Sequence, residues 1–361
     1  MKKRLLIFPV CFLAMALLPL LSAKDGEVFS KAPDLLPNET VSAADSSVMP
    51  QEKNASSPKS DEYPSAAESG ENTEEKTEEK SFIILDSSSG KTVTVNDKEF
   101  CIGALAYEMA PSFEKEALKA QTVALYTHFC RLRERERADP DKELKGADFS
   151  ADLSKGEFYL SEEQLKEKWG SVYDESIEKV KSAVGEVFGE VLKDENGELI
   201  DAAYHAISSG ATENSEDIFG FESPYLQAVA SPGDTKAPGY LSEAVFDESE
   251  LKEKLKALDE KADTSKNGAE LIGAIKKTPS GSVTEIELGG IRFSGSDVRK
   301  AFGLRSAAFE MKYDGGSYIF TVRGYGHGVG LSQYGAQSMA LEGFDYKEIL
   351  NWYYSSPVIS K

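Results

Sequence analysis

Hydrophobic and polar positions divide the chain into three stretches. Residues 5–23 form an apolar run that directly follows three basic residues at positions 2–4. Residues 24–80 contain few large apolar side chains and are rich in Ser, Glu, Lys, Pro and Ala, so they cannot bury enough surface to offset chain entropy. Over 81–361 apolar positions recur at the intervals of helices and strands. We therefore expect an apolar N-terminal segment (1–23), a disordered linker (24–80) and a folded region (81–361).

The folded region alternates between strand-like and helix-like patterns. Strands are expected at 82–85, 92–95, 190–193, 199–205, 283–288 and 318–322, with turns at 87–90 and 195–197. Helices are expected from Ser112 onward and over 160–187, 248–262, 296–302 and 346–354. Because these elements do not alternate as regular βαβ units, the pattern predicts an α+β fold. About 280 residues are enough for one large domain or for two packed lobes.

The first of these helices has a defined start in the sequence. Ser112 is its expected N-cap, and Glu114 and Glu116 complement the dipole of its first turn. The residues that share one face at helical spacing are Phe113, Ala117, Ala120, Ala124 and His128. Glu108 precedes this helix, at the junction where we expect an apolar strand to end and the helix to begin.

The N-terminal apolar run over residues 5–23 can be a cleaved secretory signal or an uncleaved membrane anchor. A basic start before an apolar run is the pattern of a secretory signal, and Leu21-Ser22-Ala23 ends in the small residues of a cleavage site. The run is also close to the roughly 20 residues that span a bilayer, with the basic residues on the cytoplasmic side. Its length favours an uncleaved anchor. We therefore expect a single-pass membrane protein with its folded region outside the cytoplasm, or a secreted protein if the signal is cleaved.

Net charge and cysteine content limit the possible partners and the possible disulfide bonds. The formal net charge is −21, whereas a nucleic-acid partner requires a basic face, so we expect no nucleic-acid partner. Behind the apolar run the chain has two cysteines, Cys101 and Cys130. They could form one disulfide in an exported protein, although the apolar neighbours of Cys101 favour a buried thiol.

The first segment with possible chemistry surrounds Glu108. Its apolar neighbours Leu105, Tyr107 and Met109 would raise the pKa of the carboxyl group if they remove it from water. A raised pKa suits a glutamate that donates a proton near neutral pH. From the residues alone the alternative is stronger, because most glutamates beside a helix start are solvated or act as caps.

Two further segments gather polar residues and glycines. Residues 204–215 are polar at the end of an apolar strand, which suits either a binding groove or a Ser-rich turn. Residues 323–336 place glycines at alternate positions around His327, which implies backbone torsions or close approaches that only glycine tolerates. This is no phosphate loop, since the Gly-x-x-x-x-Gly-Lys spacing is absent. His327 is either catalytic or a core histidine that holds the loop.

Taken in order, these segments resemble the stage II sporulation protein D family (SpoIID/LytB) over about residues 98–354. The matching motifs are Gly103-Ala104-Leu105-Ala106-Tyr107-Glu108-Met109, Glu116-Ala117-Leu118-Lys119-Ala120-Gln121, Ser209-Gly210-Ala211-Thr212-Glu213-Asn214-Ser215, Pro224-Tyr225-Leu226, Gly303-Leu304-Arg305-Ser306 and Gly324-Tyr325-Gly326-His327-Gly328-Val329-Gly330-Leu331-Ser332-Gln333-Tyr334-Gly335-Ala336. The ordered set is far more specific than any single motif.

The resemblance implies a lytic transglycosylase that acts on peptidoglycan glycan strands already stripped of stem peptides. The family's catalytic acid corresponds to Glu108. As a neutral acid it would protonate the glycosidic oxygen, and as a carboxylate it would take the proton of the muramoyl 6-hydroxyl that closes a 1,6-anhydro ring. No second carboxylate and no cofactor is required. The resemblance also implies a partner amidase like stage II sporulation protein P, and other engulfment proteins.

Two departures from the family pattern change these expectations. The family's helix usually continues Ala-Val-Ala-Ala-Arg-Thr-Tyr, whereas this chain has Tyr126 in place of the arginine. A phenol does not replace a bidentate cation, which puts activity or substrate preference in doubt. Many sporulation members also carry a Cys/His cluster after this helix. The corresponding residues 147–154 have neither type, and His128 with Cys130 makes too few ligands for zinc, so we predict no metal.

The expected site therefore consists of Glu108 as catalytic residue and a set of substrate contacts. Those contacts are Lys119, Tyr126, His205, Ser208, Thr212, His327 and Gln333. A solvated surface position is the alternative for Lys119. The competing function is a non-catalytic wall-binding module that enhances an amidase, as the LytB branch suggests. A serine hydrolase that uses Ser332 and His327 is weaker, because no nucleophile elbow is evident.

Overall fold

The computed structural model describes residues 80–361. The expected membrane segment (1–23) and the expected linker, except Lys80, lie outside the described residues. Among residues 80–361 no helix is both long enough and apolar enough to cross a membrane.

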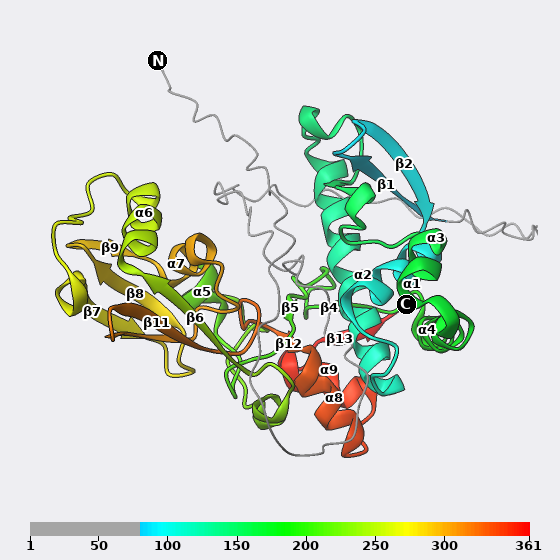
Figure 1. Cartoon of the computed structure of the whole chain (residues 1–361). Helices are drawn as coiled ribbons and strands as arrows, with labels where there is room; N and C mark the ends of the chain where they lie inside the picture. The colour runs from blue at the N-terminus through cyan, green and yellow to red at the C-terminus, as the bar shows by residue number, and fades with distance from the viewer. Residues whose placement is uncertain (1–79) are drawn as a thin grey trace, which may run out of the picture. The chain divides into compact units, whose positions relative to one another are not determined.

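Helices and short strands are mixed along the chain, which confirms the α+β class (Figure 1). The α-helices are α1 (Asp97–Glu108), α2 (Lys115–Ala138), α3 (Glu162–Trp169), α4 (Tyr173–Val187), α5 (Ser215–Phe219), α6 (Glu248–Leu258), α7 (Gly295–Phe302), α8 (Gln333–Leu341) and α9 (Tyr346–Tyr353). The strands are β1 (Ser81–Asp86), β2 (Lys91–Asn96), β3 (Phe149–Ala151), β4 (Val191–Lys193), β5 (Tyr204–His205), β6 (Leu241–Asp247), β7 (Ile272–Lys277), β8 (Val283–Leu288), β9 (Ile291–Phe293), β10 (Phe309–Asp314), β11 (Ser317–Arg323), β12 (Leu331–Ser332) and β13 (Val358–Ser360).

The strands form several small sheets. Three sheets have three strands each, in the orders β2-β1-β3, β10-β11-β6 and β7-β8-β9. Two pairs join distant parts of the chain: β5 runs parallel to β12, and β4 runs antiparallel to β13. The β5–β12 pair places Tyr204, the residue before His205, beside Leu331 in the glycine-rich segment.

Two hydrophobic clusters form the core. The first packs β1 and β3 against α1, α2 and α4, and extends to α9 (Figure 1). Its centre is aromatic: Phe100 lies with its ring centroid 4.7 Å from that of Phe129 and 4.8 Å from that of Phe82. The second cluster packs α6 and α7 against the strands β8 to β11. Each cluster has its own buried side chains, as expected for a region of this size.

The segment before Glu108 is a helix, so the expected strand at this position is wrong. Asn96 caps α1, since its side chain accepts a hydrogen bond from the Lys98 amide at 2.9 Å, and Asp97 and Glu99 lie in the acidic first turn. Apolar residues occur on several sides of α1 because it packs against α2, α4 and β1 at once. A helix buried in this way shows no helical periodicity in its sequence.

Three other boundaries differ from the expectation. Helix α2 begins at Lys115 with Glu114 as the N-cap residue, so the expected cap at Ser112 is wrong. Residues 160–187 form two helices, because Gly170 adopts a positive φ of 49° and ends α3. Of the strand expected over 199–205, only the two residues of β5 form a strand, and they pair with β12. The hairpin expected around the turn at 195–197 is reduced to a single bridge between Lys193 and Leu199.

The remaining strands and the cysteines agree better with the sequence. The strands expected at 82–85, 92–95 and 318–322 lie within β1, β2 and β11, and the strand expected at 283–288 is β8. Cys101 and Cys130 are both buried and unbonded, so each is a free thiol in this structure.

Candidate active site

Glu108 is the last residue of α1, and its side chain is buried. Only 8% of the residue is exposed, and its apolar neighbours Leu105 and Met109 are buried as well. The helix ends here because Met109 adopts an extended conformation while its amide still donates to the Leu105 carbonyl at 2.9 Å. The carboxyl group therefore sits at a helix terminus and away from bulk water.

Two neutral side chains donate hydrogen bonds to the Glu108 carboxyl group. The Tyr204 hydroxyl lies 3.3 Å from Oε1, and the Gln333 Nε2 lies 3.4 Å from Oε2. Tyr204 comes from β5, and Gln333 is the first residue of α8. The β5–β12 pairing brings these two segments together, since β12 leads directly into α8. Both carboxylate oxygens thus have a donor from outside α1.

Burial controls the protonation of Glu108. Removal from water raises its pKa from the ordinary value of 4.5 to about 7, because desolvation disfavours the charged form. The hydrogen bonds from Gln333 and Tyr204, and the positive charge of Lys168, act in the opposite direction but do not cancel the effect of burial. A carboxyl group with this pKa can give and take a proton near neutral pH.

The raised pKa has a consequence for stability. The folded-state pKa lies above the unfolded one, so the contribution of Glu108 is full below about pH 4.5 and is lost as pH rises through about 7. We expect the wild type to lose about 2 to 3 kcal/mol of unfolding free energy, relative to Glu108→Gln, between about pH 5 and about pH 8. Urea unfolding of both proteins at the two pH values measures this. Glu99→Gln, on the exposed part of α1, is the control, and an equal pH dependence of all three proteins would contradict the expectation.

A second buried carboxylate holds Gln333 in place indirectly. Asp234 accepts a hydrogen bond from the Ser332 hydroxyl at 2.8 Å and further bonds from the amide and hydroxyl of Ser208. The Ser332 oxygen in turn accepts from the Gly335 amide at 3.2 Å and so caps α8. Ser208 therefore supports the start of α8, next to Gln333. Ser332 is engaged with Asp234 and the helix cap, which does not favour its use as a nucleophile.

The two histidines of the expected site are neutral and hold the glycine-rich segment. His327 Nδ1 accepts from the Val329 amide at 3.0 Å, and burial lowers its pKa well below the ordinary value. His205 Nδ1 lies 3.1 Å from the Val329 carbonyl oxygen, and burial lowers its pKa to about 4. Gly330 has a φ of 72°, and a Cβ there would lie 2.0 Å from the Ala203 carbonyl oxygen. The glycine is thus required for the chain to approach β5.

Thr212 and Lys119 also have partners within the protein. The Thr212 hydroxyl accepts a hydrogen bond from the Val229 amide at 2.8 Å. The Lys119 ammonium pairs with Glu116 at 2.8 Å and with Glu186 at 3.4 Å. Only 12% of the Lys119 side chain is exposed, so it is not a freely solvated lysine. Its partners belong to α2 and α4 and not to the group around Glu108.

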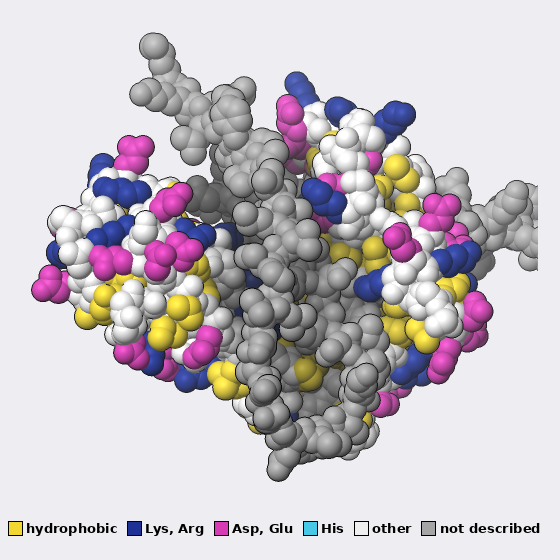
Figure 2. Space-filling model, viewed as in Figure 1, with side chains coloured by type: hydrophobic (Ala, Val, Ile, Leu, Met, Phe, Trp, Pro, Cys, Tyr) yellow, Lys and Arg dark blue, Asp and Glu magenta, His cyan; other side chains and the backbone are white. Residues whose placement is uncertain are grey.

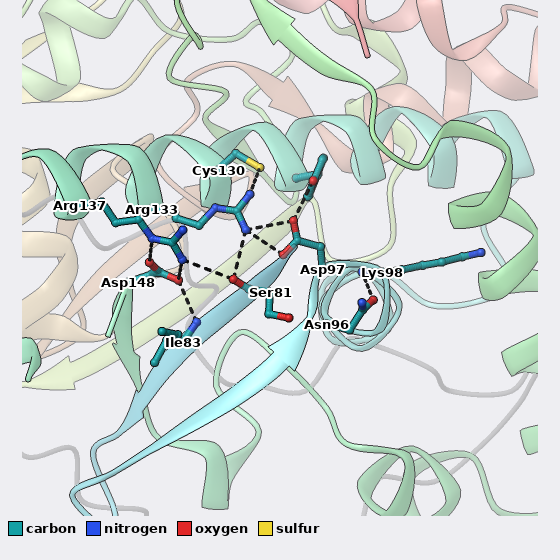
Figure 3. Close-up of polar contacts among 10 residues, drawn as sticks. Ser81, Ile83, Asn96, Asp97, Lys98, Cys130, Arg133, Arg137 and Asp148 are labelled. Carbon is teal, nitrogen blue, oxygen red and sulfur yellow. Dashed lines mark hydrogen bonds and ion pairs between the residues drawn. The ribbon is translucent and has the colours of Figure 1, made fainter. Parts of the chain in front are cut away.

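Tyr126 lies at the opposite end of α1 from Glu108. Its hydroxyl donates to Asp97 Oδ2 at 2.8 Å, and Asp97 is the first residue of α1. Eleven residues of α-helix separate Asp97 from Glu108, or about 16 Å. Arg133 supplies a guanidinium to the same aspartate at 2.8 Å (Figure 3). The departure from the family pattern at Tyr126 therefore changes the Asp97 end of the helix, where another arginine is present.

The structure adds two residues that the sequence did not single out as site residues. Tyr204 lies in the strand expected over 199–205, where alternation places it on the opposite face from His205, but no sequence signal placed it beside Glu108. Lys168 lies in α3 within no recognised motif, and no sequence signal marked it. Among the described residues no group of three or more His, Cys, Asp and Glu side chains is arranged to hold a metal ion.

Comparison with known proteins agrees with the resemblance found in the sequence. The family model described as stage II sporulation protein (SpoIID) matches residues 86–193. Stage II sporulation protein D of Bacillus amyloliquefaciens is 37% identical over 265 residues, which cover 73% of this chain and 74% of that protein. The protein of the same name from Bacillus subtilis is 36% identical with the same coverage. An amidase enhancer of Bacillus subtilis is 27% identical over 72% of this chain and 40% of its own length.

The two stage II sporulation proteins D match across most of both chains, and the residues matched by the family model include Glu108. This chain belongs to the stage II sporulation protein D family.

Proposed function

We propose that the protein is a peptidoglycan lytic transglycosylase that cleaves bonds between N-acetylmuramic acid and N-acetylglucosamine in peptide-stripped strands during sporulation. One observation carries this proposal: Glu108 is a buried carboxyl group whose pKa is raised to about 7 and whose two hydrogen-bond donors are neutral. Such a group is protonated in a large fraction of molecules near neutral pH, as a general acid must be.

The proposed reaction uses the same carboxyl group twice. Protonated Glu108 gives its proton to the glycosidic oxygen, and the bond between that oxygen and the muramoyl C1 breaks. The resulting carboxylate takes the proton of the muramoyl 6-hydroxyl as that oxygen forms a bond to C1. The product carries a 1,6-anhydro ring, water is not consumed, and Glu108 returns to its protonated form. A second carboxylate is therefore not needed, unlike in hydrolytic glycosidases.

Tyr204 and Gln333 suit both stages of this reaction. Each donates a hydrogen bond to one carboxylate oxygen, so the ionised form is held in place while it acts as a base. Because both donors are neutral, they stabilise the anion less than a paired cation would, and the carboxylate remains basic enough to accept a proton. Stripped strands must come from an enzyme that removes stem peptides, so the proposal includes an amidase that acts before this protein.

The direct test is digestion of purified glycan strands from which an amidase has removed the stem peptides. The expected products are fragments that end in 1,6-anhydromuramic acid, which weigh about one water less than hydrolysis products and are resolved by mass spectrometry. Reducing ends in place of anhydro ends would make the protein a hydrolase. Intact strands after prolonged incubation, combined with measurable strand binding, would show that the protein binds the wall without cleaving it.

A second function has support from one comparison. The relative named amidase enhancer matches 72% of this chain, which raises the alternative of a non-catalytic module that increases amidase activity. Stem-peptide release by a purified sporulation amidase, with and without this protein, separates the two functions. Under the alternative, both the wild type and Glu108→Gln would stimulate the amidase, and neither would produce anhydro ends.

A further inference from the structure

A lysine from outside the family motifs reaches the end of α1. Lys168 lies near the end of α3, and its Nζ donates to the Ala106 carbonyl oxygen at 3.0 Å. Ala106 is two residues before Glu108 on α1. The residue as a whole is exposed, whereas its charged end rests against the helix terminus that carries the acid. The side chain thus runs from the surface toward the candidate site.

Lys168 is the charged residue whose field acts on Glu108 in the described part of the chain. Its charge lowers the pKa of Glu108, while burial lowers the pKa of Lys168 itself. Lys119 on α2 and Lys166 on α3 are each paired with a carboxylate, Lys119 with Glu116 and Lys166 with Glu162 at 2.6 Å. The Lys168 ammonium has three N–H donors, and one bonds to Ala106, so it has capacity to bind a ligand.

The proposed substrate carries a carboxylate close to the bond that breaks. When the stem peptide has been removed, the lactyl group on O3 of N-acetylmuramic acid ends in a free carboxylate. In peptide-bearing strands the same group is a neutral amide. The chain has a formal net charge of −21, and Figure 2 shows acidic and basic side chains interspersed over the face in view. Recognition of an anionic strand therefore requires a local cation rather than a broad basic surface.

Building on the function proposed above, we propose that Lys168 is a specificity-determining residue that pairs with the free lactyl carboxylate of the muramoyl unit bound at Glu108. A charge-assisted hydrogen bond of this kind favours the stripped strand over one whose carboxylate is an amide. The pairing also offsets the Lys168 charge that acts on Glu108. The other groups that bond to the acid are Tyr204 from β5 and Gln333 from α8, and both are neutral. Once the substrate carboxylate offsets the Lys168 charge, bound substrate would therefore favour the protonated form of Glu108.

The test measures binding, so that it does not depend on cleavage. Two ligands are compared, a tetrasaccharide of alternating N-acetylglucosamine and N-acetylmuramic acid with free lactyl carboxylates and the same tetrasaccharide with these groups converted to methylamides. In the non-cleaving Glu108→Gln background we expect the carboxylate form to bind about 10-fold to 100-fold more tightly. Adding Lys168→Met is expected to bring this ratio close to one, whereas Lys168→Arg should retain most of it. Lys166→Met, on the same helix, is the matched control and should leave the ratio unchanged.

Each outcome decides the matter. An unchanged ratio in Lys168→Met, equal binding of the two ligands before the substitution, or no binding of either ligand overturns the assignment. If Lys168 were only structural, its loss would lower the melting temperature and weaken both ligands equally. Failure of the proposed function gives a different result: the wild type would form no anhydro ends while the binding ratio and its dependence on Lys168 persisted.

Discussion

Replacing Glu108 by Gln is expected to lower the rate at which 1,6-anhydromuramoyl ends form by about 10²-fold to 10⁴-fold. Gln has nearly the same shape, and its amide oxygen can still accept a hydrogen bond from one of the two donors, Tyr204 or Gln333, but its amide group cannot give a proton to the glycosidic oxygen. The loss should therefore appear in kcat, while strand binding remains. Product analysis by mass spectrometry and a separate binding titration measure the two quantities.

A second buried glutamate provides the control for this experiment. Glu213 also has a pKa raised by burial, and it accepts hydrogen bonds from the Thr278 hydroxyl at 3.0 Å and the Ser282 amide at 3.2 Å. Gln at this position keeps an acceptor for both donors, so Glu213→Gln should retain most of the activity. If Glu213→Gln lost activity and Glu108→Gln kept it, the acid would be assigned to the wrong carboxyl group.

Replacing Arg133 by Met is expected to lower the free energy of unfolding by about 3 to 5 kcal/mol. Its guanidinium contacts both oxygens of Asp97, at 2.8 and 3.0 Å (Figure 3). Both side chains are nearly inaccessible to water. Removal of the cation leaves the Asp97 carboxylate buried with the Tyr126 hydroxyl as its remaining donor from α2. Urea unfolding monitored by circular dichroism measures the change.

Two variants control the interpretation of this result. Arg137 also pairs with a buried aspartate, Asp148, but 55% of its own side chain is exposed, and the Ile83 amide still binds the same carboxylate. Arg137→Met should therefore cost only about 1 kcal/mol. The double variant Asp97→Asn with Arg133→Met should recover part of the lost stability, because no unpaired charge remains. Wild-type stability of Arg133→Met would contradict the assignment.

The contacts of Tyr126 and Arg133 with Asp97 also change the interpretation of Tyr126, which stands where the family usually has an arginine. From the sequence, loss of the family arginine placed activity in doubt. In the structure Tyr126 and Arg133, two turns apart on α2, bind the same aspartate at the start of α1. We therefore expect Arg133→Met to affect stability far more than the rate of anhydro-end formation in folded protein, since Glu108 lies at the other end of the helix.

Local pattern predicted much of the fold. Strand β11 buries every second residue, Tyr318, Phe320 and Val322, since one of its faces is packed against the core, and this spacing is visible in the sequence. The pattern failed for α1, because a helix buried on several sides has no polar stripe and reads like a strand. It failed again for β5, whose partner β12 is more than a hundred residues away along the chain.

The sequence by itself determined the α+β class, the family and Glu108 as the candidate acid, because these depend on local spacing and on ordered motifs. Only the tertiary structure decided what surrounds that acid. Tyr204, Gln333 and Lys168 come from β5, α8 and α3, and Tyr204 and Gln333 are 96 and 225 residues from Glu108. Protonation of a carboxyl group depends on burial and on neighbours within a few ångströms, and such neighbours are set by packing between segments that sequence spacing does not relate.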